Sequence, residues 1–365
     1  MPCASCQTDQ SREAAIRPLH DVAIVEAYAA DAPLGLRLAG GLAARIAADL
    51  GARVVKIETG GGDPLRGIPP FIGDTSTTAA FLDAGKRIVP DHDGAFADAD
   101  VVILDEALRR RSTELPPVVA VLSLFKPEAR HGPASSFTVE ALGGLLDMVG
   151  DPGREPLRLA GNQAAYAAGL SAFAGIAAAL CKPKVAGRAA AETVHVSMLD
   201  TVVWLNWKSA PFVAPAPLLS RAGAAAEWQV IRCADGWVAL VYQDADWAGL
   251  CDMVDDARLR APCFAGRAER LRRIQEVTQI IAERFLLRRR EALHAEALKR
   301  RLPIGPVWSV EELVADPQNV ARGLFAPVGA AGCAAAAMPQ LPVVWGGMRF
   351  PAGALAPHDV MVAHR

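Results

Sequence analysis

The chain has 365 residues, of which 52% are hydrophobic and 21% charged, and its formal net charge is -2. This length allows two domains, and this composition is typical of globular proteins with a large core. A net charge near zero excludes a strong overall positive field of the kind that draws proteins to nucleic acid or anionic lipid. The seven cysteines are irregularly spaced, which favours a reducing, cytoplasmic setting over a disulfide framework.

Residues 1–20 form a polar N-terminal tail without the apolar core of a signal peptide. Cys3 and Cys6 make one C-x-x-C pair in this tail, but no second pair follows. A zinc site needs about four ligands. We therefore predict no metal site.

The order of the first elements predicts a parallel sheet. Residues 22–26 form an apolar run typical of a buried strand, and residues 38–50 repeat an apolar residue every fourth position, as a helix does. Gly51 stands where a helix ends, and residues 53–58 form a second apolar run. A strand, helix and strand in this order favour a doubly wound α/β fold.

Further along, apolar runs predict strands at 99–104 and 118–125, and helices are predicted at 140–149, 164–181 and 194–207. The segment 164–181 is nearly uncharged and almost long enough to span a membrane. Its high content of Ala and Gly favours instead a helix packed closely inside a protein, so we expect no membrane association.

A second pattern begins after a stretch rich in Pro and Ala at 210–226, which we interpret as a linker. Asp235-Gly236 separates two strand-like runs, which predicts a hairpin. Residues 267–301 predict amphipathic helices. Their basic residues are interrupted by Glu291 and Glu296, which favours a solvated helix face over a nucleic-acid surface.

Several segments, in the same order along the chain, resemble the family III CoA-transferases, which also include α-methylacyl-CoA racemase. They are LAGG with ADLGARVVKIE at 38–58, GGGDPLR at 60–66, GKR at 85–87, GR with VHVSML at 187–199, DGWVAL at 235–240, PIGPV at 303–307 with DPQ and ARG at 316–323, and ALAPH at 354–358.

The resemblance implies a large Rossmann-like domain built from both chain ends, a smaller α+β domain and two interlocked chains. The predicted regions are a polar tail (1–20), the large domain (21–209), a linker (210–226), the small domain (227–302), and a linker with the C-terminal return to the large domain (303–365).

In the resembling transferases an Asp carboxylate attacks the acyl-CoA thioester. Counting back from GIAAAL at 175–180, the resemblance puts this nucleophile at Ala165, whose methyl group cannot attack. The Asp of the racemase branch falls at the same position, and its His falls near Ser135 or Ser136, so that pair is absent too. Glu140 is the best-placed substitute acid, ahead of Asp147 and Asp151, although a helix-surface or capping acid is the plainer interpretation of each.

The resemblance also assigns residues to coenzyme A or acyl-CoA. Backbone at Ala39 and Gly40 and the lysine Lys86 fall at contact positions, with Lys56 and Arg66 as further cations. Substrate-contact candidates beside the vacant nucleophile position are Asn162, Gln163 and Tyr166. Other positions depart from the family: Thr59 replaces an arginine, Asp83-Ala84 replaces Asn-Arg, Asp105 replaces an asparagine, and the glycine-rich loop is not visible near 214–226.

These departures leave three hypotheses. The chain is a catalytically impaired partner subunit of a heteromeric CoA-transferase; or it is a stand-alone acyl-CoA transferase, isomerase or lyase that uses a substitute residue; or it is a non-catalytic binding or regulatory protein. The expected assembly is a homodimer or a heteromer with a related subunit.

Overall fold

The structure is a computed structural model that describes residues 17–58, 61–90, 96, 98–127, 132–182, 192–206, 228–328 and 336–353. Cys3, Cys6, Thr59, the linker 210–226 and the tail 354–358 lie outside these residues. The chain divides into two compact units. The large unit holds Met1–Leu146, Arg158–Ala216 and Pro317–Arg365, and the small unit holds Asp147–Leu157 and Pro217–Asp316.

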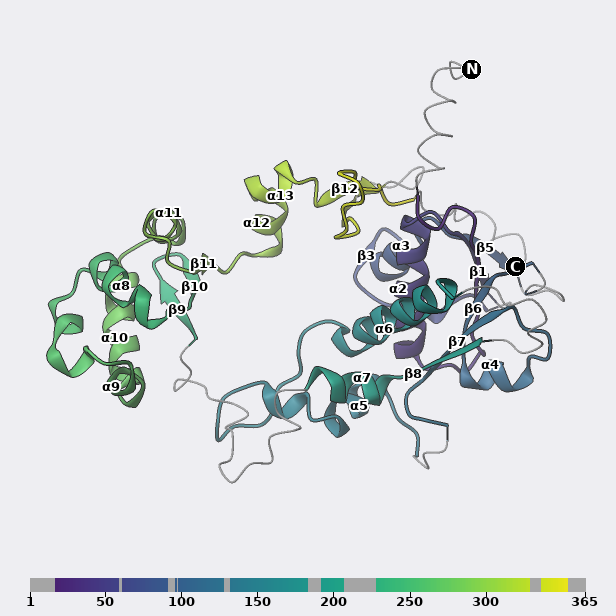
Figure 1. Ribbon diagram of the computed structural model, residues 1–365, viewed down its shortest axis with the longest axis horizontal. Coiled ribbons are helices and arrows are strands. Elements are labelled where there is room, and N and C mark those ends of the chain that lie inside the picture. The colour runs from purple at the N-terminus through teal and green to yellow at the C-terminus, as the bar shows by residue number, and fades with distance from the viewer. Residues whose placement is uncertain are drawn as a thin grey trace, which may run out of the picture. The chain divides into compact units, whose positions relative to one another are not determined.

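A six-stranded parallel sheet forms the centre of the large unit (Figure 1), which confirms the predicted α/β class. Its strands run in the order β5-β2-β1-β6-β7-β8. In chain order they are β1 (Ala23–Glu26), β2 (Arg53–Glu58), β5 (Arg87–Pro90), β6 (Val101–Asp105), β7 (Val118–Ser123) and β8 (Glu192–Ser197). The strand order reverses direction beside β1, because β2 and β5 lie on one side of it and β6 to β8 on the other.

Two predicted helices were wrong in part. Residues 194–207 contain the end of strand β8, which pairs with β7 along its whole length. Helix α7 (Met198–Leu205) begins after Ser197, whose side chain caps it by accepting a hydrogen bond from the Asp200 N–H. A short apolar run fits either structure, and here pairing with β7 decides. Residues 140–149 contain the end of α5 (Ser136–Leu142) and the short η2 (Leu146–Met148).

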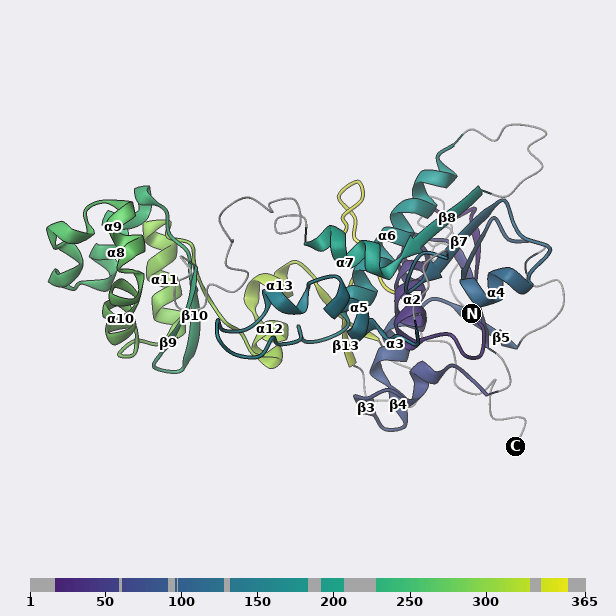
Figure 2. The same ribbon diagram turned by 90° about the horizontal axis from the view of Figure 1, so that it is seen from below.

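Helices α2 (Leu34–Asp49) and α6 (Gln163–Leu180) cover one face of the sheet, and α4 (Glu106–Arg111) lies on the other (Figure 2). By length and composition, α6 is the one helix in the described part of the chain that could cross a membrane. It packs instead on α2 at very short range. A Cβ on Gly169 would lie 2.4 Å from the Ala39 carbonyl oxygen, so this contact requires glycine.

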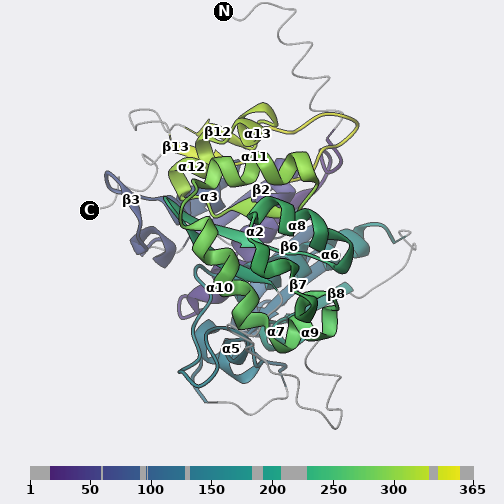
Figure 3. The same cartoon turned by 90° about the vertical axis from the view of Figure 1, so that its left-hand side faces the viewer.

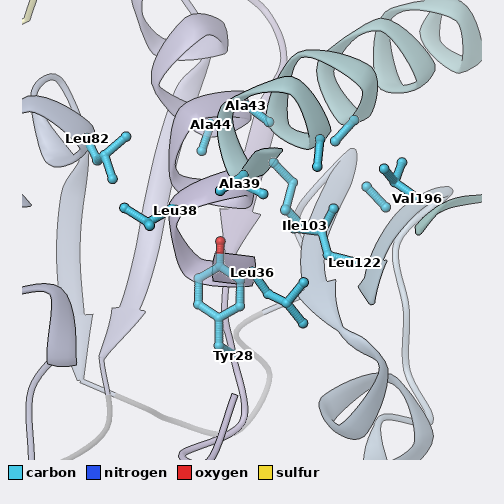
Figure 4. Close-up of a cluster of buried hydrophobic side chains, with 14 of the residues drawn as sticks. Tyr28, Leu36, Leu38, Ala39, Ala43, Ala44, Leu82, Ile103, Leu122 and Val196 are labelled. Carbon is cyan, nitrogen blue, oxygen red and sulfur yellow. The ribbon is translucent and has the colours of Figure 1, made fainter. Parts of the chain in front are cut away.

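The main core lies between these helices and the sheet (Figure 4). The Tyr28 side chain follows β1, and its hydroxyl points toward α2. A Cβ on Gly40 would lie 2.0 Å from that hydroxyl and 2.9 Å from Leu122. The Gly40 position therefore lets α2 approach the sheet closely.

The remaining elements of the large unit are η1 (Pro64–Gly67), β3 (Phe71–Ile72), β4 (Thr75–Ser76), α3 (Thr77–Asp83), α13 (Pro317–Ala321), β12 (Phe325–Val328) and β13 (Ala336–Pro339). The C-terminal return reaches the edge of the sheet, because Gly353 packs directly on Gly85, just before β5.

The small unit contains an antiparallel sheet of β9, β10 and β11 and a group of helices, of which α8 to α11 are labelled in Figure 3. The predicted hairpin is confirmed, since Cys233 pairs with Gly236 across the turn. The elements are β9 (Gln229–Cys233), β10 (Gly236–Leu240), η4 (Asp244–Asp246), α8 (Trp247–Val254), η5 (Ala257–Arg260), η6 (Pro262–Phe264), α9 (Arg267–Arg272), α10 (Ile274–Phe285), α11 (Arg290–Arg300), β11 (Ile304–Pro306) and α12 (Val310–Ala315).

Basic side chains of α11 are paired with acids. Arg290 binds Glu312 at 2.6 Å, and Arg300 binds Glu296 at 3.0 Å. Each of these two arginines is therefore neutralised by an acid of the small unit.

Candidate functional site

The topology points to the carboxyl ends of β1 and β6 as the place for a site, because open α/β sheets bind ligands where the strand order reverses. Asp105 ends β6 at this place and is 3% exposed. Its carboxylate accepts hydrogen bonds from the backbone N–H groups of Ala29 at 2.7 Å and of Ala107 at 2.9 Å. The carboxylate is therefore engaged in joining the loop after β1 to the start of α4.

At the carboxyl ends of the neighbouring strands β1 and β2, charged side chains form a network that we call the buried ion cluster. Its four carboxylates and four cations are joined by a continuous series of ion pairs. The members are Glu26, Glu58, Asp63 and Asp83 with Arg37, Lys56, Arg66 and Lys86.

Lys56 lies at the centre of this cluster on β2. Its Nζ is 2.7 Å from an Asp63 carboxylate oxygen and 2.9 Å from one of Asp83. Burial alone would lower the pKa of Lys56, but the carboxylates of Asp83, Glu26 and Asp63 outweigh it and raise the pKa. Burial likewise opposes ionisation of Asp63, and Lys56 overcomes it and lowers the pKa of Asp63. Both groups are therefore charged at neutral pH.

Lys86 is fully buried and pairs with Glu26, with 2.5 Å between Nζ and a carboxylate oxygen. It also donates to the Gly41 carbonyl at 2.9 Å, which ties it to helix α2. The Tyr28 hydroxyl donates to the same Glu26 carboxylate at 3.1 Å. Burial, and then the Glu26 charge, raise the pKa of Tyr28 well above its usual value, so the hydroxyl keeps its proton.

Arg66 is the most accessible cation of the buried ion cluster, with 29% of its side chain exposed. It makes a two-pronged pair with Glu58, with hydrogen bonds of 2.7 and 3.1 Å. The sequence-predicted cofactor contacts Lys56, Arg66 and Lys86 are thus brought into one network. Each of them is already neutralised by a carboxylate of this chain.

Ala39 and Gly40 lie inside helix α2, which begins at Leu34 rather than at the predicted 38. Only the first four N–H groups of a helix are free of intrahelical bonds. The N–H groups of Ala39 and Gly40 therefore bond to carbonyls of their own helix, and both residues are buried under Tyr28 and α6.

Ala165 lies in the first turn of α6 and is 1% exposed, among the apolar residues of the main core. The three predicted substrate contacts surround this helix start. Asn162 precedes the helix, and its side chain makes no capping hydrogen bond. Gln163 is exposed and donates to the Ala160 carbonyl at 3.3 Å, and Tyr166 is half-buried against the core.

Glu140, the predicted substitute acid, lies on α5 and is 3% exposed. Its carboxylate accepts from Arg158 Nε at 3.2 Å. Nearby, Ser135 caps α5 through the backbone N–H of Thr138. The buried Glu140 carboxylate therefore has a structural role in its ion pair with Arg158. To act as a nucleophile or general base, it would have to leave this pair.

Sequence reasoning missed the acids of the buried ion cluster. Glu26 and Glu58 each end an apolar strand, and this position was a usable signal, because a charge inside such a run needs a buried partner. Lys86, which pairs with Glu26, and Asp83, which pairs with Lys56, come from a later segment of the chain, so these two pairs could not be read from the sequence. Among the described residues, no group of three or more His, Cys, Asp or Glu side chains is arranged to hold a metal ion.

Comparison with known proteins identifies relatives along most of the chain. The family model described as CoA-transferase family III matches residues 33–90 and 106–359. Succinate–glutarate CoA-transferase of Agrobacterium fabrum is 28% identical over 355 residues, covering 84% of each chain. The alpha subunit of succinyl-CoA–L-malate CoA-transferase of Chloroflexus aurantiacus is 27% identical and covers 84% of this chain and 80% of its own length. A CaiB/BaiF family protein from Brucella suis has the same fold, with a TM-score of 0.77 at 22% identity over 93% of this chain and 96% of its own.

Proposed function

The chain belongs to CoA-transferase family III, and from this premise we propose that it is a partner subunit of a heteromeric CoA-transferase whose nucleophilic Asp is supplied by a related chain. The observation that carries the proposal is Ala165. The position that the family resemblance gives to the nucleophile holds a methyl group closed within the apolar core.

The state of the cations supports the same proposal. Phosphate recognition needs positive charge and free N–H donors. Here Lys56, Arg66 and Lys86 are paired with carboxylates of the same chain. A subunit with a structural role in the assembly can keep its cations paired in this way. The partner subunit would then bind the acyl-CoA thioester.

The relatives make such an assembly reasonable, since one of them is named as the alpha subunit of a CoA-transferase. We propose that this chain and its partner interlock as related subunits. The irregular spacing of the cysteines supports a reducing, cytoplasmic setting for them.

Native mass spectrometry of the chain purified from its own host, with and without CoA, tests the assembly. We expect a heteromer with a related chain. Incubation of that complex with labelled succinyl-CoA, followed by peptide mapping, should place a hydroxylamine-sensitive label on an Asp of the partner and leave the present chain unlabelled. A homodimer that turns over succinyl-CoA by itself contradicts the proposal.

The stand-alone alternative depends on Glu140 as a substitute nucleophile. It predicts that the purified chain alone acquires the label and that Glu140→Gln abolishes it. The Arg158→Gln variant is the matched comparison, because it releases the Glu140 carboxylate from its ion pair and should then increase labelling.

A further inference from the structure

The described residues cover the second face of the central sheet, opposite to α2 and α6, only in part. The chain must cross from β5 at the edge, past β2 and β1, to β6, and only residues 91–100 are available for this crossing. A crossover between parallel strands usually takes a dozen or more residues and contains a helix. Phe96 and Ala99 pack on this face, and α4 covers β6 and β7.

A cavity of about 650 Å³ lies over β1, β2 and β5, and we call it the second-face pocket. Its volume is in the range that small organic ligands occupy. Val25, Val55 and Val89 contribute apolar side chains from three neighbouring strands. Val25 and Val55 alternate with Glu26 and Lys56 along their strands. Since successive side chains point to opposite faces, the second-face pocket is separate from the buried ion cluster.

Two arginines lie together on the same face. Arg87 pairs in register with Val55, and Arg53 is two residues before Val55 on the same strand. Both line the pocket and are exposed. Neither has an ion-pair partner among the described residues. Among the described residues that line this cavity, Asp98 on the crossing segment is the acid.

We propose that the second-face pocket binds an organic acid with an apolar body, such as a medium-chain carboxylate. Its chain lies on Val25, Val55 and Val89, and its carboxylate lies between Arg53 and Arg87. Guanidinium groups match the planar, two-oxygen geometry of a carboxylate, while the valines make apolar contact with the chain. The site is independent of the proposed CoA-transferase role, because it uses the opposite face of the sheet.

Methyl NMR of the full-length chain titrated with octanoate tests the proposal. Octylamine and octan-1-ol provide the same apolar chain with a positive or a neutral head group. We expect octanoate to shift the methyl signals of Val25, Val55 and Val89 with an affinity of about millimolar, and the other two probes to bind at least about tenfold more weakly.

The variant Arg53→Gln/Arg87→Gln should weaken octanoate binding about tenfold, and Arg111→Gln, an exposed arginine on α4, should leave it unchanged. Val55→Phe should block binding by filling the pocket, with the circular dichroism spectrum retained. Equal binding of octylamine, or undiminished octanoate binding by the double arginine variant, overturns the proposal. Neither result depends on CoA or on a partner subunit, so failure here is distinct from failure of the proposed function.

Discussion

Introducing the missing carboxylate, by Ala165→Asp, should destabilise the chain rather than restore a nucleophile. Ala165 is 1% exposed among apolar neighbours. A buried Asp would take up a proton at pH 7, which costs about 4 kcal/mol against an ordinary pKa of about 3.9. Burying the neutral acid adds about 1–3 kcal/mol. The nearby start of α6 stabilises an anion rather than a protonated acid, so it returns little. We expect a net loss of about 5–7 kcal/mol.

The sign of the pH dependence follows from the raised pKa of this introduced acid. The proton is bound in both the folded and unfolded chain below about pH 4, so the penalty is smallest there and grows as the pH rises toward 7. Urea denaturation at pH 4.5 and pH 7 measures this difference. Ala174→Asp on the same helix is the matched control, because Ala174 is exposed, and it should lose only about 0.5 kcal/mol through helix propensity at either pH.

A result that refutes this reasoning is easily recognised. If Ala165→Asp unfolds at the same urea concentration as the unaltered chain and forms a hydroxylamine-sensitive adduct with succinyl-CoA, position 165 is open to ligand. The chain then lacks only its nucleophile, and the burial argument is wrong.

Three further changes probe the packing and charges around the buried ion cluster. Lys86→Met leaves Glu26 buried with Tyr28 as its one hydrogen-bond donor among the described side chains. Urea denaturation should show a loss of about 3–5 kcal/mol, with a smaller loss in Glu26→Gln/Lys86→Met. Gly40→Ala places a Cβ 2.0 Å from the Tyr28 hydroxyl and should lower the melting temperature despite the helix preference of Ala. Adding Tyr28→Phe to this variant should recover part of the loss. If the effects of the two changes on the melting temperature simply add, the clash with the hydroxyl is not the cause. Asp63 has a lowered pKa, so it stabilises the fold above about pH 4 and loses this effect in acid; Asp63→Asn should therefore flatten the acid limb of a stability-against-pH profile.

The central strands of the large unit, and the β-hairpin and amphipathic helices of the small unit, follow from local sequence signals. β2 was predicted with its observed bounds because its apolar run is bordered by Gly51 and by polar residues. The start of α2 was placed four residues late, since the fourfold apolar repeat begins at Leu38 while Pro33 sets the true beginning of the helix. Residues 194–197 of β8 were assigned to a helix because the identity of this strand depends on pairing with β7, whose residues lie 74 positions earlier in the chain.

Three cations of the buried ion cluster were named from the sequence, but the carboxylates that pair with them were not. Lys56, Arg66 and Lys86 were expected together, and they are close in the structure. Their partners were not foreseen: Lys86 reaches Glu26, 60 residues away, and Lys56 reaches Asp83, 27 residues away. Such contacts depend on how strands are ordered in the sheet, and a single sequence contains no local pattern for that order.

The charge balance of the buried ion cluster bears directly on how an acyl-CoA could be held. Four cations face four carboxylates, so the cluster has no net charge to offer a phosphate. Replacing one of these carboxylates by a phosphate would leave the displaced acid buried without its partner, and that penalty is several kcal/mol. Arg66 is the exception, because its partly exposed side chain can contact a second anion while it keeps Glu58. Phosphate recognition by this chain would therefore have to use Arg66 or cations outside the cluster, and under the proposed function the partner subunit would supply the other cations.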